Sequence, residues 1–315
     1  MNTVESFRYD LFSKWTSIGT LQAVMRDPDA FDSVYASLQD DASRAVFDWF
    51  IHVRAAYSVM GKGAFALYPA SIARSDYVEL TSSLGKRTIR GYRVGKRIID
   101  SDPSAIIDSM LREQYRLSGL VEAERGDVVL DIGAYKGETA LWFADQVGPE
   151  GLVLAMEPSV QTGVILRQNV VRNRSPAAAP IVILPCAAGA RKGTDRFIAT
   201  GGSASGLGVR GETMVATTTV EAVVTEQHLS RVDFIKMDIE GGEVDALKGA
   251  EETLKRFTPR LAISVYHRPN DLPDIVALVR QACSCCRLYL SHKSPGLGET
   301  VLFARCGLGE DGAHA

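Results

Sequence analysis

The stretch that most constrains the fold is residues 128–139, where an apolar run leads through an acid into a glycine-containing turn. The run Val128–Ile132 has the apolar, β-branched composition of a buried strand, and Gly133 and Gly137 follow closely. Glycine lets the backbone approach a ligand closely, and the first turn of a helix presents free N–H groups. The sequence therefore predicts a strand, a ligand-binding turn and a helix in succession.

From residue 128 onwards, apolar runs alternate with amphipathic segments. The apolar runs cover residues 128–132, 152–156, 181–184, 232–239 and 261–266. The amphipathic segments cover residues 139–147, 159–171, 220–229, 243–257 and 271–282. This alternation is typical of an α/β protein with a mainly parallel sheet and helices on both faces.

Two further apolar runs, residues 287–291 and 299–305, close the pattern. The link between them is too short to hold a crossover helix, so we expect an antiparallel hairpin. Five parallel strands and this terminal hairpin predict a seven-stranded, Rossmann-like sheet, which resembles the architecture of class I methyltransferases. We place this domain at residues 121–307.

The first third of the chain, residues 1–120, is predicted to be a helical accessory region. Apolar side chains recur with a helical period, as at Val46, Phe47 and Phe50. A further helix is expected from Pro103 to about residue 121. The last residues, 308–315, are expected to form a flexible tail.

The composition argues against several classes of protein. Lysine and arginine number 35 against 38 for aspartate and glutamate, so no overall basic field exists to hold nucleic acid. No stretch approaches the roughly 20 apolar residues of a membrane-spanning helix, and the first residues do not resemble a signal peptide. We expect a cytoplasmic protein with neither a nucleic-acid partner nor a membrane span.

The cysteines give no clear metal or disulfide pattern. They are Cys186, Cys283, Cys285, Cys286 and Cys306. An odd count with three of them clustered is unlike a disulfide framework. One C-x-x-C spacing exists near His292, but no second pair completes a structural zinc site. We expect free thiols that pack as small apolar side chains.

Polar residues follow the predicted strands at the edge where ligands bind in doubly wound sheets. Asp131 ends the first strand, and its carboxylate suits the sulfonium and ammonium groups of S-adenosylmethionine, the cofactor that we expect. Glu157 ends the second strand and can accept hydrogen bonds from ribose hydroxyls. The other expected cofactor contacts are Gly133, Ala134, Tyr135, Gly137, Thr139, Pro158, Cys186, Ala187 and Asp238.

The glycine spacing argues against a nicotinamide cofactor. A dinucleotide site uses G-x-G-x-x-G, whereas here Gly133 is separated from Gly137 by three residues. An acid before the turn would also repel a pyrophosphate. A nicotinamide-dependent oxidoreductase and a non-catalytic binding or scaffold protein remain the alternatives.

The predicted catalytic residues are His267, at the end of the fifth strand, and Asp238, at the end of the fourth. Our hypothesis is that His267 accepts the proton of an acceptor hydroxyl, while Asp238 orients the acceptor or holds the cofactor's amino group. Together with Glu240 they could instead bind a divalent ion. We favour the version without a metal.

Residues from about 120 to 305 resemble the FkbM family of S-adenosylmethionine-dependent methyltransferases. The resemblance lies in residues 129–139, 155–158, 233–243, 264–267 and 288–292. The segment D-F-I-K-M-D-I-E-G-G-E at 233–243 is its most specific part. The helical first third resembles only an accessory segment that some members carry.

The resemblance implies O-methylation of a hydroxyl on a sugar, a glycolipid or a natural product. We accordingly expect a small-molecule, carbohydrate or lipid-linked acceptor, and a homodimer stays open. The glycine- and serine-rich stretch at 200–208 is interpreted either as a flap beside the acceptor or as a plain surface loop.

Overall fold

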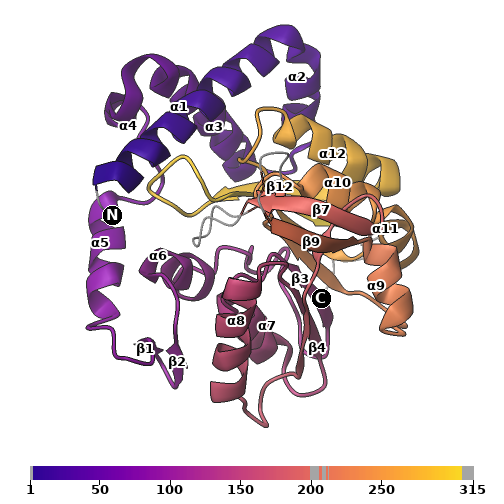
Figure 1. The fold of residues 1–315 in the computed structure, drawn as a ribbon. Helices are drawn as coiled ribbons and strands as arrows, with labels where there is room; N and C mark the ends of the chain where they lie inside the picture. Colours follow the sequence, from indigo (N-terminus) through magenta and orange to yellow (C-terminus); the bar gives the residue numbers. More distant parts are fainter. Residues whose placement is uncertain (1–2, 199–205, 208–210, 212, 307–315) are drawn as a thin grey trace, which may run out of the picture.

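The computed structural model describes residues 3–198, 206–207, 211 and 213–306. At its centre lies a seven-stranded sheet with the order β12-β13-β11-β10-β3-β4-β5 (Figure 1). These strands are β3 (Val128–Ile132), β4 (Leu152–Met156), β5 (Ile181–Leu184), β10 (Phe234–Met237), β11 (Arg260–Ser264), β12 (Arg287–His292) and β13 (Thr300–Arg305). Strands β5, β4, β3, β10 and β11 are parallel, and β13 runs antiparallel between β11 and β12. The predicted sheet is confirmed.

Helices cover both faces of the sheet because both faces are apolar. Leu130 and Ile132 of β3 join one hydrophobic core, whereas Val129 between them joins the core on the opposite face. The helices that follow the strands are α7 (Glu138–Val147), α8 (Val160–Arg172), α9 (Val220–Glu226), α10 (Glu243–Lys248), α11 (Glu251–Phe257) and α12 (Asp271–Ala282).

One predicted helix, residues 243–257, is divided into α10 and α11. The break lies at Gly249, where the chain passes very close to another loop. A Cβ atom at this position would lie 2.1 Å from the carbonyl oxygen of Gly189. The close approach therefore requires a residue without a side chain, and glycine favours the end of a helix.

The N-terminal helices pack against the sheet and its outer strand (Figure 1). They are α1 (Thr3–Arg26), α2 (Pro28–Ser37) and α3 (Asp41–Met60). Leu38 forms a parallel bridge with Leu288 of β12, and the Ser43 hydroxyl accepts a hydrogen bond from the Leu290 N–H at 3.0 Å. These contacts satisfy part of the exposed edge of β12. The division at residue 120 stays a prediction, because these helices share a core with the sheet.

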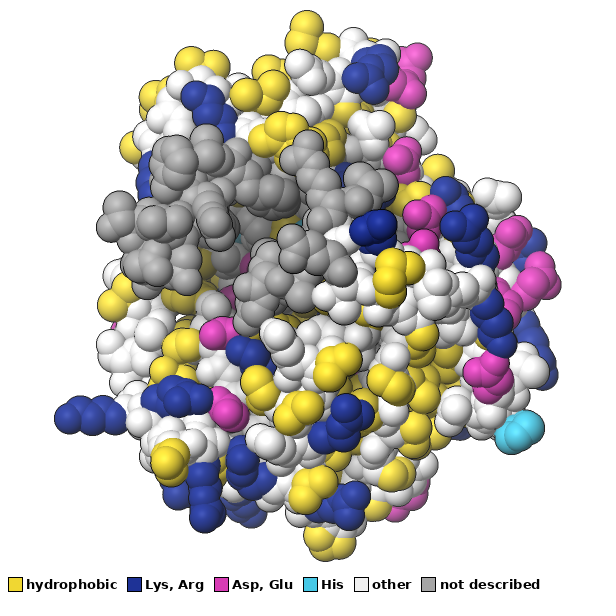
Figure 2. All heavy atoms as spheres, viewed as in Figure 1, with side chains coloured by type: hydrophobic (Ala, Val, Ile, Leu, Met, Phe, Trp, Pro, Cys, Tyr) yellow, Lys and Arg dark blue, Asp and Glu magenta, His cyan; other side chains and the backbone are white. Residues whose placement is uncertain are grey.

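Several further elements connect α3 to β3. They are η1 (Gly61–Gly63), α4 (Ala64–Leu67), α5 (Arg74–Ser83), β1 (Tyr92–Val94), β2 (Arg97–Ile99), α6 (Pro103–Ile106) and the π-helix η2 (Ile107–Leu111). Figure 2 shows lysine and arginine side chains gathered at the lower left, over β1 and β2. The segment around β1 and β2 contains the exposed Lys86, Arg90, Arg93 and Lys96.

The helix predicted from Pro103 to about residue 121 is wrong beyond Leu111. Glu113 adopts a φ of +50°, which is incompatible with a continuing α-helix, and Leu117 pairs with Val121 in an antiparallel bridge. Tyr115 is still buried, but in a loop that leads to the sheet. The apolar spacing had indicated which residues are buried without showing that the chain turns.

A second, four-stranded sheet was not predicted. Its order is β6-β9-β7-β8, with β6 (Ala187–Ala188), β7 (Gly193–Ile198), β8 (Gly206–Leu207) and β9 (Thr213–Thr218). The sheet lies beside the central one in Figure 1 and contributes Phe197 and Gly206 to the pocket described below. The stretch at 200–208, interpreted as a flap or a loop, lies outside the described residues apart from 206–207, and so does the expected tail at 308–315.

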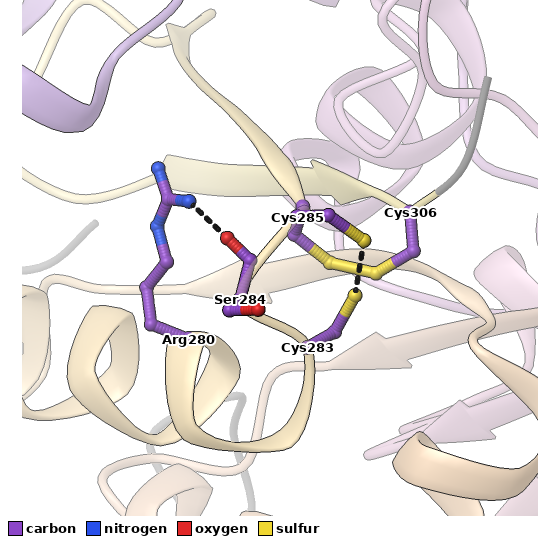
Figure 3. Close-up of a disulfide and its surroundings, with 6 residues drawn as sticks. Arg280, Cys283, Ser284, Cys285 and Cys306 are labelled. Atoms are coloured by element: carbon purple, nitrogen blue, oxygen red, sulfur yellow. Dashed lines mark hydrogen bonds between the residues drawn. A yellow bond between two sulfur atoms is a disulfide. The ribbon is translucent and has the colours of Figure 1, made fainter. Parts of the chain in front are cut away.

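A disulfide joins Cys286 to Cys306 (Figure 3), so the expectation of free thiols is wrong at these two positions. The hairpin register explains the bond. Arg287 of β12 pairs with Arg305 of β13, which places the next residues outward, Cys286 and Cys306, opposite each other with their Cα atoms 4.2 Å apart. The free cysteines are Cys186, Cys283 and Cys285.

Among the helices of the described residues, we find none that combines the length and the apolar composition needed to cross a bilayer.

Candidate active site

A pocket of about 580 Å³, part of which opens to solvent, lies at the carboxyl ends of β3, β4 and β10. This is the edge of a doubly wound sheet where ligands are expected. The lining residues are Ile132, Gly133, Tyr135, Met156, Glu157, Pro158, Thr162, Cys186, Ala187, Ala188, Phe197, Gly206, Asp238, Ile239, Glu240 and Gly242. Seven of the sequence-predicted residues line it: Gly133, Tyr135, Glu157, Pro158, Cys186, Ala187 and Asp238.

The glycine turn forms one wall of the pocket. Gly133 has a φ of +85°, and a Cβ atom there would lie 1.9 Å from the carbonyl oxygen of Asp238. The N–H groups of Gly133 and Ala134 both donate to the Met156 carbonyl at 3.0 Å. A residue with a side chain at 133 would force β3 and β10 apart, so the turn holds the two strand ends together.

Asp131 lies beneath this turn and does not line the pocket. Its Oδ1 is 3.2 Å from Nζ of Lys236, and its Oδ2 accepts a hydrogen bond from the Thr139 hydroxyl at 2.6 Å. The parallel register sets Lys236 of β10 directly beside Asp131 of β3. Lys236 also donates to the Gly133 carbonyl at 2.6 Å. The strand-end acid is thus neutralised by a buried lysine that supports the turn.

Glu157 lies in the pocket, at the end of β4. Its Oε2 accepts from the Tyr135 N–H at 3.1 Å, and its Oε1 accepts from the Ser159 N–H and the Thr162 hydroxyl, each at 2.8 Å. Burial raises the pKa of this carboxyl group, although these hydrogen bonds favour the charged form. Oε2 makes one of these bonds and Oε1 makes two, so Oε2 is the oxygen better placed to accept another donor.

The neighbouring wall is small and apolar. Ala187 and Phe197 are buried, and Pro158 and Cys186 complete the surface beside Glu157. Burial raises the pKa of the Cys186 thiol to about 11, so this group is neutral at physiological pH. Such a wall can accommodate a flat, uncharged ring.

Tyr135 connects the pocket to the N-terminal region. Its hydroxyl donates to Asp102 Oδ2 at 2.6 Å, and Lys136 Nζ lies 3.0 Å from the same oxygen. Tyr135 has a φ of +47°. The three other predicted cofactor contacts, Ala134, Gly137 and Thr139, belong to the turn and the start of α7 and do not line the pocket.

The predicted catalytic histidine lies one layer behind the pocket wall. His267 is buried, and its Nε2 is 3.3 Å from Asp238 Oδ1 and 3.5 Å from Glu240 Oε2. Its Nδ1 is 3.0 Å from Glu243 Oε1. The fold thus brings together His267, Asp238 and Glu240, although they come from two different loops, and it adds Glu243 at the start of α10.

The carboxylates change the protonation of this cluster. Burial lowers the pKa of His267, but Glu243, Glu240 and Asp238 outweigh it and raise that pKa well above its ordinary value. Burial raises the pKa of Glu240 to about 8. Without a bound cation, these carboxylates therefore favour the doubly protonated imidazole. It must lose one proton before it can accept one from a substrate.

A set of polar residues behind Asp238 was not predicted from the sequence. The Tyr115 hydroxyl donates to Asp238 Oδ2 at 2.5 Å, and Gln114 donates to Glu299 at 2.6 Å. Tyr266 also donates to Glu299, at 3.2 Å. Burial raises the pKa of Glu299 to about 8. Glu299 stands at the start of a predicted strand, and the local sequence does not indicate that Gln114 and Tyr266 bind it.

Asp108 was missed as well. It lies on the π-helix η2, is buried, and accepts a hydrogen bond from the Tyr77 hydroxyl at 3.1 Å. Burial raises its pKa to about 7. The sequence does contain one indication of Asp108, because it is an acid within the largely apolar segment 105–111. Burying a carboxyl group in such a segment costs free energy unless the group has a hydrogen-bond partner. Short π-helical segments are also frequent at functional sites.

Comparison with known proteins supports this fold. Residues 131–284 match the model of the methyltransferase FkbM domain. A methyltransferase FkbM from Methylobacillus flagellatus KT superposes with a TM-score of 0.59 and 19% sequence identity, covering 90% of this chain. This chain spans 60% of the length of that protein. No curated protein matches the sequence significantly.

Two further solved structures are similar at a lower level. Aeropyrum pernix fibrillarin in complex with S-adenosyl-L-methionine has a TM-score of 0.39 and 16% identity, covering 62% of this chain and 74% of its own. A Bacillus cereus O-methyltransferase in complex with SAH has a TM-score of 0.40 and 12% identity, covering 82% of this chain and 99% of its own. The expected class I methyltransferase fold, with its helical N-terminal region, is confirmed.

Proposed function

Residues 131–284 match the methyltransferase FkbM domain, and from this premise we propose that the protein transfers a methyl group from S-adenosylmethionine to a hydroxyl oxygen. The observation that carries the proposal is the position of two carboxylates in one pocket. Glu157 follows β4 beside a small apolar wall, and Asp238 follows β10. A polar, hydroxyl-bearing nucleoside and a cationic tail fit such an arrangement.

The residues present suit this cofactor. Glu157 Oε2 would accept from the ribose hydroxyls, and the wall of Pro158, Cys186 and Ala187 would hold the adenine. Asp131 would act indirectly, because its charge is paired with Lys236 and the pair fixes the turn at Gly133. Its expected contact with the cofactor is thereby amended.

The proposed reaction is an in-line displacement. S-adenosylmethionine supplies a methyl group whose carbon–sulfur bond breaks, with the electron pair kept by sulfur, as the acceptor oxygen forms the new bond. The main contribution of the protein is alignment, which can lower a barrier by about 7–11 kcal/mol. Proton removal by a general base adds roughly 10²–10⁴-fold in rate. Positioning by the pocket therefore matters more than the base.

We assign the acceptor's proton to the pair formed by Asp238 and His267. Asp238 lines the pocket and is held by the Tyr115 hydroxyl, while His267 lies behind it. The carboxylate is thus the member of the pair that can contact the acceptor. Asp238 would take up the proton as the acceptor oxygen forms its new bond, and His267 would position this carboxylate, which amends the predicted role of His267 as the base itself.

The acceptor that we propose is a hydroxyl of a sugar, a glycolipid or a natural product. Asp238 and Glu240 line the pocket, and their carboxylates are suited to accepting hydrogen bonds from neutral hydroxyls. We further propose that the protein acts in the cytoplasm, on a small or lipid-linked acceptor. The Cys286–Cys306 disulfide counts against a cytoplasmic location, because disulfides are rare in reducing compartments. Cell fractionation tests the location.

Titration calorimetry tests the cofactor assignment. We expect S-adenosylhomocysteine to bind with one site per chain and NADH not to bind. Binding of NADH alone would favour an oxidoreductase. A screen of methyl-labelled cofactor against hydroxylated sugars and glycolipids then tests transfer. Tight cofactor binding without transfer to any acceptor would favour a non-catalytic protein.

A further inference from the structure

We propose that Asp238, Glu240 and His267 bind a divalent cation of the Mg²⁺ and Mn²⁺ class beside the pocket. One ligand atom from each residue lies within 4.8 Å of the other two. This inference rests on the proposed methyl transfer, and it replaces the metal-free version that the sequence alone favoured. The cation would hold the acceptor oxygen and lower its pKa.

The distances suit such an ion. His267 Nε2 lies 3.3 Å from Asp238 Oδ1 and 3.5 Å from Glu240 Oε2. Ligands at about 2.1 Å from an octahedral ion are separated by about 3 Å when they occupy adjacent positions. Shifts of a few tenths of an ångström would therefore bring Nε2 and each of these two oxygens to the separation of adjacent ligands.

The second nitrogen of His267 faces a carboxylate, as the corresponding nitrogen of a metal-binding histidine usually does. Nδ1 lies 3.0 Å from Glu243 Oε1, and this same oxygen accepts a hydrogen bond from the Ile239 N–H at 2.8 Å. Metal-ligating histidines usually direct their other ring nitrogen to a carboxylate, which fixes the ring and its tautomer. Here that arrangement turns Nε2 toward Asp238 and Glu240.

Within the described part of the chain neither ring nitrogen of His267 makes a hydrogen bond of good geometry, although the residue is only 3% exposed. Nδ1 still lies close to Glu243, whereas Nε2 is farther from both of its neighbouring carboxylates. A buried polar nitrogen without a partner is costly. Nε2 faces two carboxylates that belong to the pocket wall. A cation placed between them would satisfy the nitrogen and both carboxylates at once.

The balance of charge also favours a cation. Asp238, Glu240 and Glu243 form ion pairs with His267, and no ion pair within the described part of the chain joins any of the three to a lysine or an arginine. Three carboxylates around one imidazole leave an excess of negative charge in a poorly solvated place. A divalent ion compensates it with oxygen ligands of the kind it prefers.

A second set of ligand atoms, from Glu243, His267 and Asp271, is less suitable. All three residues are buried, and the Asp271 carboxylate already accepts a hydrogen bond from the Arg268 N–H at 2.6 Å. By contrast, the side chains of Asp238 and Glu240 are 19% and 24% exposed. The first set therefore leaves coordination positions open for water or an acceptor oxygen.

The test uses Mn²⁺ alone, added to the full chain, with free Mn²⁺ measured by electron paramagnetic resonance. We expect one bound ion per chain and competition by Mg²⁺. Asp238→Asn and Glu240→Gln should each weaken binding at least 10-fold, and Glu243→Gln about 10- to 100-fold through the histidine. Asp274→Asn, an exposed acid on α12, serves as the matched control and should change affinity less than 2-fold.

Unchanged Mn²⁺ affinity in both Asp238→Asn and Glu240→Gln would overturn the proposal, and so would the absence of binding at millimolar Mn²⁺. If Mn²⁺ affinity falls in Asp271→Asn but not in Asp238→Asn or Glu240→Gln, the ion binds to the second set and the proposed site is wrong. If a variant fails to fold, the unmodified protein is studied by NMR with added Mn²⁺. Broadening of the His267 imidazole signals supports the proposal, and unbroadened signals contradict it. Calorimetry with S-adenosylhomocysteine separates the two proposals, because its binding without Mn²⁺ binding refutes only the metal.

Discussion

Nζ of Lys236 lies 3.2 Å from Oδ1 of Asp131, and both side chains are almost completely buried at the base of the pocket. The two residues are direct neighbours in the parallel pairing of β10 with β3. Because Lys236 also donates to the Gly133 carbonyl, the ion pair fixes the glycine turn. The acid that marks the motif in the sequence thus supports the pocket from beneath.

Replacing Lys236 with methionine should destabilise the protein strongly. Removing one member of a buried ion pair leaves an uncompensated charge, and the expected loss in the free energy of unfolding is about 3–5 kcal/mol. Urea denaturation measures it. The double variant Lys236→Met with Asp131→Asn should recover part of the loss, whereas a loss below about 1 kcal/mol in the single variant would show that Asp131 does not depend on the lysine.

Replacing Glu157 with alanine should weaken binding of S-adenosylhomocysteine about 10- to 100-fold, since hydrogen bonds to a charged group contribute about 1.5–3 kcal/mol. Titration calorimetry gives the affinity. Glu157 also holds the start of α8, so the control is Ser159→Ala, which removes another hydrogen bond of that helix start but keeps the carboxylate. The control should bind nearly as the parent does; equal weakening in both variants would point to a merely structural role.

Replacing His267 with glutamine should lower kcat by about 10²-fold or more while leaving the affinity for S-adenosylhomocysteine within about 3-fold. His267 lies behind the pocket wall and acts on Asp238 and Glu240, so its loss affects the acceptor and not the nucleoside. The assay uses the acceptor found in the screen. A parallel loss of cofactor affinity would contradict this separation of roles.

Glu138, the buried first residue of α7, should make stability depend on pH. Burial raises its pKa in the folded protein to about 8, from an ordinary value of 4.5. Its contribution to stability is therefore complete below about pH 4.5 and is lost as the pH rises toward 8, because the folded state must then bury a charge. Glu138→Gln, compared with the parent by denaturation at pH 5.5 and 8.5, should reduce the fall in stability. If Glu138→Gln loses as much stability between pH 5.5 and 8.5 as the parent does, other groups cause the pH dependence.

Replacing Cys306 with serine should lower the free energy of unfolding by about 3 kcal/mol. The disulfide closes a loop with a sequence separation of 20, and loops of about this length restrict the unfolded chain by that amount. Denaturation without reductant measures the effect, and Cys285→Ser, at an exposed free thiol, is the control. No difference between the parent and Cys306→Ser would mean that the bond does not form in solution.

Much of the fold follows from patterns along the chain. The strands β3, β4 and β5 begin and end where the apolar runs predict, because both faces of a parallel sheet are buried and each strand reads as a continuous apolar stretch. The terminal hairpin follows from the short link before β13. Gly133 and Gly137 indicate the turn because both adopt positive φ angles, which glycine takes far more readily than other residues.

The remaining features depend on contacts between distant segments. β6 and β8 have two residues each, which is too short for any periodicity to show. The lysine partner of Asp131 and the cysteine partner of Cys286 follow from strand register, which local pattern does not give. Tyr115 and Glu299 reach the site from regions expected to be a helix and the terminal hairpin.

The most direct measurement is a crystal structure of the protein with bound S-adenosylhomocysteine. It should place the ribose hydroxyls at Glu157, the adenine against Cys186 and Ala187, and the sulfur at the Asp238 end of the pocket. A nucleoside bound elsewhere on the chain, or a Glu157 carboxylate turned away from the ribose, would contradict the account.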